Sequence, residues 1–161
     1  MTQEDKELLL KDLAARLPYG VKILNNGWDF DRDCEFSTVE TLIGIDDRFI
    51  YTLWRDEKDK HSIGEPLSIL DYKPYLRPLS SMTEEEREEL EHLSEEYFGK
   101  ALDKQIQESL SSSNRNESEI LECIASSVIV DWLNFNHFDF RGLISKNLAI
   151  EVTEENDPYK E

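Results

Sequence analysis

The chain has 161 residues, of which 39% are hydrophobic and 34% charged, and its 36 acidic and 18 basic residues leave a formal net charge of −18. This length and apolar content suit a folded domain that needs no disulfide or metal, and the charge argues against direct binding to nucleic-acid phosphates or anionic membrane surfaces. No apolar run approaches the roughly 20 residues that span a bilayer, and the acidic start Met1–Asp5 lacks a signal peptide's basic region, so we expect a cytoplasmic protein.

Motifs for common chemistries are missing from the sequence. The two cysteines, Cys34 and Cys123, lie far apart and form no CxxC pair, so we expect buried free thiols rather than redox or zinc chemistry. The sequence contains no glycine-rich phosphate loop, no GxSxG and no HExxH. We therefore predict no cofactor.

The N-terminal region is predicted to be helical. Apolar residues spaced i, i+3, i+4 and i+7 indicate an amphipathic helix over residues 4–17, with Thr2 as its N-cap. Pro18-Tyr19-Gly20 ends this helix. Val21–Leu24 then begins a strand, and Asn25-Asn26-Gly27 directly after it has the composition of a turn.

Strand patterns follow. Beginning at Phe36, side chains alternate between two faces. Glu40 and Leu42 lie on one face, and the other carries Val39, Thr41, Ile43 and Ile45. Phe49–Trp54 is apolar on both faces, which is typical of a central strand, and we expect a fourth strand around Leu67–Leu70. Tyr72–Pro78 contains two prolines and is predicted to be an extended connector.

The second half of the chain is predicted to be mainly helical. Thr83 and Glu86 have the spacing of a capping box and begin a helix that runs to about Phe98, before Gly99. A shorter helix over residues 101–110 follows.

The most hydrophobic helix is predicted over residues 118–136, with Trp132 and Phe135 on its core stripe. A short closing element over residues 143–150 then leads to a frayed acidic tail.

Together these elements predict an α+β protein: an N-terminal helix on a small antiparallel β-meander of three to five strands, followed by a C-terminal helical section. We expect a single domain over residues 1–161. Its parts are the helix and meander (1–72), a connector (73–82), the helical section (83–150) with a flexible loop (111–117), and an acidic tail (151–161).

One acidic stretch matches a calcium-loop template in part. Asp29, Asp31, Asp33 and Glu40 stand at template positions 1, 3, 5 and 12. The glycine required at position 6 is Cys34, and both flanks are predicted strands rather than helices. A solvated hairpin loop explains the spacing better, so we predict no metal site and keep the four carboxylates only as weak candidates for divalent ions.

Segment Asp131–Ile144 gathers four aromatic residues around one histidine, two aspartates and one arginine. His137 with Asp131 and Asp139 has the residue types of a general-base pair or of part of a metal site. However, Asp131 and His137 are six residues apart, off the same helical face, and no second histidine or cysteine lies nearby. We expect Asp139 to cap the turn after it and Arg141 to pair with an acid of a neighbouring helix.

We therefore predict no catalytic residue. His137, Asp139, Arg141 and Asp131 remain candidates for binding.

Acidic residues cluster in Glu84–Glu91, Glu95-Glu96 and Glu151–Glu161. A solvated helix face is the simpler interpretation. The alternative is that this surface imitates the phosphates of a duplex and occupies the basic groove of a nucleic-acid-binding protein.

Three segments, Leu13–Val21, Lys73–Glu84 and Asp131–Ile144, together resemble a family of small proteins found in gut Bacteroidetes genomes, often in prophage or mobile-element settings. The resemblance extends over most of the chain and implies no activity. Residues 111–118 have the character of a variable insertion.

We therefore expect an acidic accessory protein, of phage or mobile-element origin, that acts through contacts with a protein partner. The sequence names neither that partner nor the oligomeric state. The alternatives are an acidic mimic that inhibits a DNA- or RNA-binding host factor, and a metal-dependent or His/Asp hydrolase.

Overall fold

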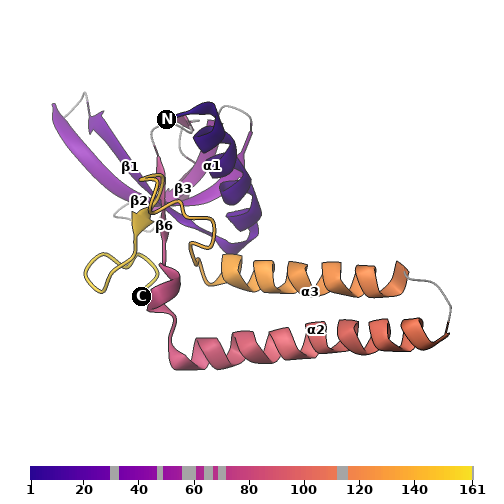
Figure 1. Ribbon diagram of the computed structural model, residues 1–161. Coiled ribbons are helices and arrows are strands. Elements are labelled where there is room, and N and C mark those ends of the chain that lie inside the picture. The colour runs from indigo at the N-terminus through magenta and orange to yellow at the C-terminus, as the bar shows by residue number, and fades with distance from the viewer. Residues whose placement is uncertain are drawn as a thin grey trace. The chain divides into compact units, whose positions relative to one another are not determined.

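The computed structural model describes residues 1–29, 33–46, 49–55, 61–63, 67–68, 72–111 and 116–160. The chain divides into two compact units, which are described separately: Met1–Leu79 together with His137–Glu161, and Ser80–Asn136. The first unit holds the N-terminal helix and the sheet, and the second holds a pair of helices (Figure 1). The predicted α+β class is confirmed, as are its N-terminal helix, antiparallel meander and C-terminal helices.

Helix α1 (Gln3–Arg16) begins and ends where the sequence predicts. Thr2 Oγ1 accepts the Asp5 N–H at 3.1 Å, and the Asp5 carboxylate accepts the Thr2 N–H at 3.2 Å, which makes a reciprocal capping box. A 3₁₀ turn, η1 (Leu17–Tyr19), follows, and Gly20 lies in the left-handed region at φ 65°. Glycine adopts this conformation without the clash that a Cβ would cause, so the chain turns here into the sheet.

In the described residues, one mixed sheet contains seven strands, with the order β4-β3-β2-β1-β6-β7 and β5 paired with β3. All pairings are antiparallel except that of β6 with β7. The strands are β1 (Lys22–Asp29), β2 (Cys34–Ile45), β3 (Phe49–Arg55), β4 (His61–Ile63), β5 (Leu67–Ser68), β6 (Lys73–Leu76) and β7 (Ile150–Glu151).

Two predicted irregular segments are in fact strands. Asn25-Asn26-Gly27 lies inside β1, whose ladder with β2 runs without interruption as far as Asp29 opposite Cys34, so the predicted turn is wrong. Asparagine and glycine favour turns only where no partner strand competes for the backbone. The connector predicted at Tyr72–Pro78 contains β6, because the extended backbone that proline imposes is also that of a strand.

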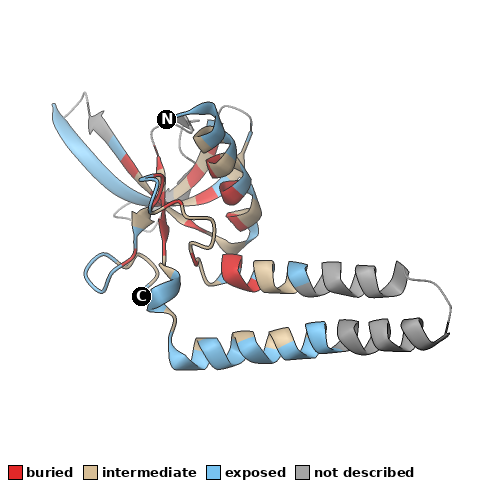
Figure 2. Cartoon of the chain, viewed as in Figure 1, coloured by how far each residue is buried: buried red, intermediate tan, exposed pale blue. Residues whose placement is uncertain are grey.

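The first unit buries one face of its sheet beneath α1. The predicted alternation in β2 is confirmed as far as Ile43, and the buried face is the one that carries Glu40 and Leu42, whereas Val39 and Ile43 are 47% and 41% exposed. The predicted place of Ile45 on the face of Val39 is wrong, because the pairing of β2 with β3 shifts register between Leu42 and Gly44. Ile45 therefore lies opposite the buried Ile50 and packs against the core. Leu9 and Leu13 of α1 are fully buried against this face (Figure 2). The other members of the core cluster are Val21, Ile23, Leu42, Ile50, Tyr72, Leu76, Leu143, Leu148 and Ala149.

The second unit contains α2 (Glu84–Ser111) and α3 (Asn116–Phe135), which lie side by side. The predicted capping box is confirmed, since Thr83 Oγ1 accepts the Glu86 N–H at 3.2 Å and the Glu86 carboxylate accepts the Thr83 N–H at 2.8 Å. A 3₁₀ turn, η3 (Leu79–Ser81), precedes α2.

The predicted break near Gly99 is wrong, because α2 is continuous through it. An interior helical glycine costs only about 1 kcal/mol, which packing along a 28-residue helix readily offsets. Phe135, expected in the core, is 63% exposed at the last position of α3, while Trp132 and Leu133 are buried. Of the predicted flexible loop, residues 112–115 lie outside the described residues.

No helix among the described residues combines the length and apolarity needed to cross a membrane.

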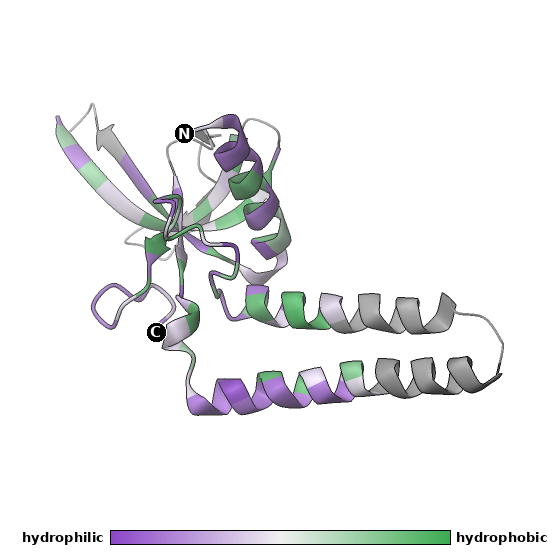
Figure 3. Cartoon of the chain, in the orientation of Figure 1, coloured by the Kyte–Doolittle hydropathy of each residue, from purple (hydrophilic) through white to green (hydrophobic). Residues whose placement is uncertain are grey.

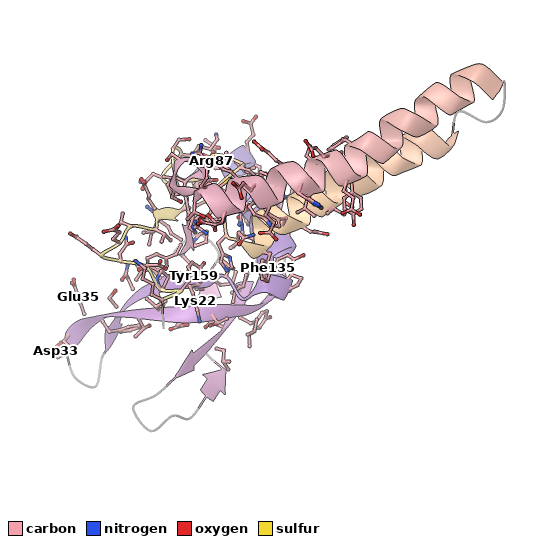
Figure 4. All side chains as sticks on the ribbon, turned by 90° about the horizontal axis from the view of Figure 1, so that it is seen from below. Lys22, Asp33, Glu35, Arg87, Phe135 and Tyr159 are labelled. Atoms are coloured by element: carbon pink, nitrogen blue, oxygen red, sulfur yellow. The ribbon has the colours of Figure 1, made fainter. Side chains whose placement is uncertain are left out.

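The C-terminal tail, predicted to fray, is packed on the first unit. The Val152 N–H donates to the Leu76 carbonyl at 2.8 Å. The Tyr159 hydroxyl accepts the Lys22 N–H at 3.1 Å and donates to the Tyr75 carbonyl at 2.9 Å (Figure 4). Lys22 and Tyr75 would be the next pair of the β1–β6 ladder, so this hydroxyl bridges the two strands where they separate.

Replacing Tyr159 by Phe removes this bridge and leaves a backbone donor and acceptor without their partner. We expect Tyr159→Phe to lower the free energy of unfolding by about 1–3 kcal/mol, measured by urea denaturation. Tyr51→Phe is the matched control, because its hydroxyl bonds the exposed Asp46 at 2.9 Å, and it should cost less than about 1 kcal/mol. Equal midpoints for wild type and Tyr159→Phe would contradict this role.

Candidate functional site

The structure places three of the four predicted site residues in one bend of the first unit. His137, Asp139 and Arg141 lie between the end of α3 and β7, in a segment bonded to α1 and to the residue after β6. Asp131 is an exposed residue of α3 and belongs to the second unit. The bend is therefore built from His137, Asp139 and Arg141 alone.

Asp139 holds the bend by a local cap, as predicted. Its two carboxylate oxygens accept the backbone N–H groups of Leu143 and Ile144, both at 2.8 Å. A carboxylate is well suited to this task because it accepts several hydrogen bonds from backbone donors. Both oxygens of Asp139 are thus engaged with the backbone.

Arg141 pairs with an acid of α1, also as predicted. Its Nη1 lies 2.7 Å from Oδ1 of Asp12, a carboxylate with no exposed surface. Asp12 also binds Arg16 of its own helix, with Arg16 Nε 2.7 Å from Oδ2 and Nη2 3.1 Å from Oδ1. One buried carboxylate therefore pairs with two guanidinium groups, which leaves one positive charge in excess.

Sequence reasoning missed Asp12 and Arg16. Their i, i+4 spacing is the available signal, because it places an acid and a base together on the helix face that also carries Leu9 and Leu13. Arg16 is fully buried, and its Nη2 donates to the Phe138 carbonyl at 2.7 Å, which ties α1 to the bend.

Aromatic rings line these cations. The Arg141 guanidinium lies 4.2 Å from the centre of the Phe140 ring, and that of Arg16 lies 5.7 Å from the same ring. Arg77 lies 4.4 Å from the ring centre of Phe138, which is fully buried. Such cation–π contacts stabilise partly desolvated arginines. The aromatic residues of the bend thus serve as packing partners of the arginines.

His137 adopts the left-handed conformation at φ 58°, and its ring stacks on Tyr159 with centroids 4.1 Å apart and planes 13° apart. Burial, and after it the positive charges of Arg16, Arg77 and Lys22, lower the pKa of His137 to about 4. At neutral pH the imidazole is therefore uncharged, and with this pKa it is a weak base.

The described carboxylates of the partial calcium-loop match, which are kept only as weak candidates, do not come together. Glu40 pairs with Ile23 and Asp29 pairs with Cys34, so Glu40 lies six residues further along β2, about 20 Å from the hairpin end at the rise of an extended strand. Asp33 sits at that end, and Asp31 lies outside the described residues. Within the described part of the chain, no group of three or more His, Cys, Asp or Glu side chains has a metal-binding arrangement.

Glu40 instead centres a buried polar network that the sequence did not predict. Its carboxylate accepts from Asn25 Nδ2 at 2.7 Å, from Thr38 Oγ1 at 2.9 Å and from the Thr52 hydroxyl, and the Tyr72 hydroxyl donates to Asn25 Oδ1 at 3.0 Å. The sequence did contain a signal for this network: Glu40 is a charged residue on the same face of the alternating strand as the apolar Leu42. Because its donors and acceptors are paired, this network specifies the register of the sheet.

No family model, curated protein or solved structure matches this chain.

Removing the shared carboxylate would leave two arginines without their counter-charge, one of them fully buried. We expect Asp12→Ala to destabilise the protein by about 3–5 kcal/mol in chemical denaturation. Lys146→Ala is the matched control, because its 3.3 Å pair with Asp5 is at the surface and should contribute less than about 1 kcal/mol. Equal losses in the two variants would disprove the importance of the buried pair.

His137 makes stability depend on pH. Because its pKa is about 4 in the folded state against 6.5 in the unfolded state, the unfolded chain binds more protons between these values. The His137 contribution is complete above about pH 6.5 and is lost as the pH falls towards 4, by up to about 3 kcal/mol. His137→Asn, which tolerates positive φ, should flatten the profile of unfolding free energy over this interval.

His92→Asn, at an exposed position of α2, is the control for loss of a histidine. If the unfolding free energy of His137→Asn changed with pH as steeply as that of wild type, His137 would not be the source of this pH dependence.

Proposed function

We propose that this chain is a non-enzymatic accessory protein that binds another protein through the outer face of its sheet. The supporting observation is a group of large apolar side chains on the face opposite α1. Val39 and Ile43 of β2 are 47% and 41% exposed, and Phe49 of the adjacent β3 is 36% exposed. Exposed apolar side chains that gather on one surface are typical of interaction sites.

These residues share a face because of the strand register. Leu42 lies opposite Thr52, and both are buried, so Val39 points to the other side of the sheet by alternation. Ile43 stands at the register shift between Leu42 and Gly44 and is likewise exposed. Tyr51 packs on this side, 3.3 Å from where a Cβ of Gly44 would lie. Much of β2 is exposed in Figure 2, although Figure 3 shows hydrophobic positions along it.

The charge of the chain indicates the chemistry of the partner. The apolar patch is followed towards the hairpin end by the exposed acids Asp33 and Glu35 (Figure 4), and the chain as a whole carries −18. A surface with an apolar centre and flanking lysines or arginines is complementary to it.

The hydrolase alternative has weaker support. His137 is stacked under Tyr159 and has a lowered pKa, and both oxygens of Asp139 accept backbone N–H groups. These side chains already act in holding the bend, which is the structural interpretation of the segment.

A second candidate, the acidic mimic, is favoured by α2. Glu84, Glu88, Glu91 and Glu95 follow one another at spacings of four, three and four residues, and all are exposed. At the rise of an α-helix they form a row of carboxylates about 16 Å long. Such a row presents regularly spaced negative charge, as a nucleic-acid strand does.

Capture of partners from cells with matched variants separates the candidates. Val39→Ser/Ile43→Thr changes the sheet face, and its control is Leu79→Ser, at a 46% exposed apolar residue. We expect the sheet variant to capture at least tenfold less of the partner than wild type does, as quantified by mass spectrometry. The control variant should capture as much partner as wild type. Equal capture by wild type and the sheet variant would refute binding through the sheet.

The mimic predicts a different result. Replacement of four glutamates by glutamine should then abolish capture of the partner; these are Glu84, Glu88, Glu91 and Glu95. Duplex DNA should also compete with the chain for its partner. The control neutralises four exposed acids elsewhere, Glu4, Glu7, Glu154 and Glu155.

A further inference from the structure

Two buried nitrogens of the first unit, Arg16 Nη1 and His137 Nδ1, have no hydrogen-bond partner among the described residues. Leaving a buried polar group unsatisfied costs about 1–3 kcal/mol, so such atoms in folded proteins usually face an ordered water or an ion. Arg16 has no exposed surface, and its other two nitrogens are satisfied by Asp12 and by the Phe138 carbonyl. The orphaned Nη1 therefore indicates a missing acceptor.

The two nitrogens belong to the same neighbourhood. Arg16 Nη2 lies 2.7 Å from the carbonyl oxygen of Phe138, the residue directly after His137. Nη1 and Nη2 are held on one rigid planar group, so Nη1 lies beside the same stretch of backbone. The charge of Arg16 also acts on the His137 imidazole.

The charges around this neighbourhood favour an anion over a water molecule. The positive charges of Arg16, Arg77 and Lys22 act on the His137 imidazole, whose ring stacks on that of Tyr159. The Arg77 guanidinium lies over the Phe138 ring, and the Lys22 ammonium donates to Thr41 Oγ1 at 2.8 Å. The nearby acids are already engaged: Asp12 binds two arginines, and Asp139 accepts backbone N–H groups. Asp157, whose charge acts on Tyr159, accepts the Tyr159 N–H at 2.9 Å and pairs with Lys160. The acid-rich chain thus has a local excess of positive charge in its interior, which stabilises a bound negative ion.

We propose that this cluster, beneath the Tyr159 ring, binds one small monovalent anion of the halide class between Arg16 Nη1 and His137 Nδ1. Arg16 donates from Nη1, and the uncharged imidazole donates from Nδ1 in the tautomer that carries its proton there. These two nitrogens are the buried side-chain donors without a partner among the described residues, so a halide suits them better than a phosphate, which requires more hydrogen bonds. The site is independent of the proposed docking face.

The test compares the full-length protein in sodium bromide and in sodium gluconate, whose anion is too large to enter, at equal ionic strength. Bromide at tenfold above its Kd should raise Tm by about 3–6 °C. Bromide should also raise the pKa of His137, followed by NMR, because a neighbouring negative charge favours the protonated ring. A crystal grown in bromide should show its anomalous signal between the two nitrogens.

His137→Gly keeps the positive φ and removes the ring, so the bromide increment in Tm should disappear. Asn147→Gly, another left-handed position at φ 58°, controls for the backbone change and should retain the increment. Each salt also has a general effect on Tm that does not depend on the site. Because this effect is the same in both variants, comparing their bromide-dependent changes in Tm removes it.

An equal His137 pKa in the two salts would overturn the proposal, as would a water in place of bromide. The NMR and crystal measurements use wild type, so they remain decisive if a variant fails to fold.

Discussion

The first unit depends on one buried carboxylate. Asp12 accepts from Arg16 in its own helix and from Arg141 in the C-terminal bend, so it links segments 129 residues apart in the sequence. A buried ion pair is stable only when its charges are paired and hydrogen-bonded, and the Phe138 carbonyl provides a further acceptor for Arg16. The position of α1 over the sheet and the course of the bend are thus coupled through this group.

This coupling explains the composition of the bend. The arginines of the site need ring faces and acceptors as well as counter-charge, and Phe138 and Phe140 provide ring faces within 4.4 and 5.7 Å of guanidinium groups. His137 lies in the left-handed region at φ 58°. Its imidazole is uncharged at neutral pH because burial, and after it the neighbouring positive charges, lower its pKa. A segment whose residue types resemble a catalytic site is therefore accounted for by the packing of the fold.

The two faces of the sheet differ in what they bury and what they expose. Glu40 lies on the buried face, where Asn25, Thr38 and Thr52 donate to it, whereas Val39 and Ile43 lie on the exposed face. The sheet thus buries a paired carboxylate and leaves branched apolar side chains in solvent. The proposed docking of a protein partner rests on this difference between the two faces.

Local signals were sufficient for the helix starts and for the strand alternation. Thr2 and Thr83 cap their helices as predicted, because a capping box involves only residues three positions apart. Gly20 ends the first helical segment for a similarly local reason. In the site, the cap made by Asp139 was predictable because its acceptor geometry is local, and the pairing of Arg141 with a helix acid was expected only in general terms.

The rest required the tertiary structure. The turn expected at Asn25 became part of β1 because β2 pairs with it, and the tail expected to fray is held by Tyr159, whose partners lie 84 and 137 residues away. Composition and short spacings determined the helix starts, the alternation of the strands and the net charge, since these depend on neighbours along the chain. Which face is buried, and which acid Arg141 meets, depend on contacts between distant segments, which only the fold brings together.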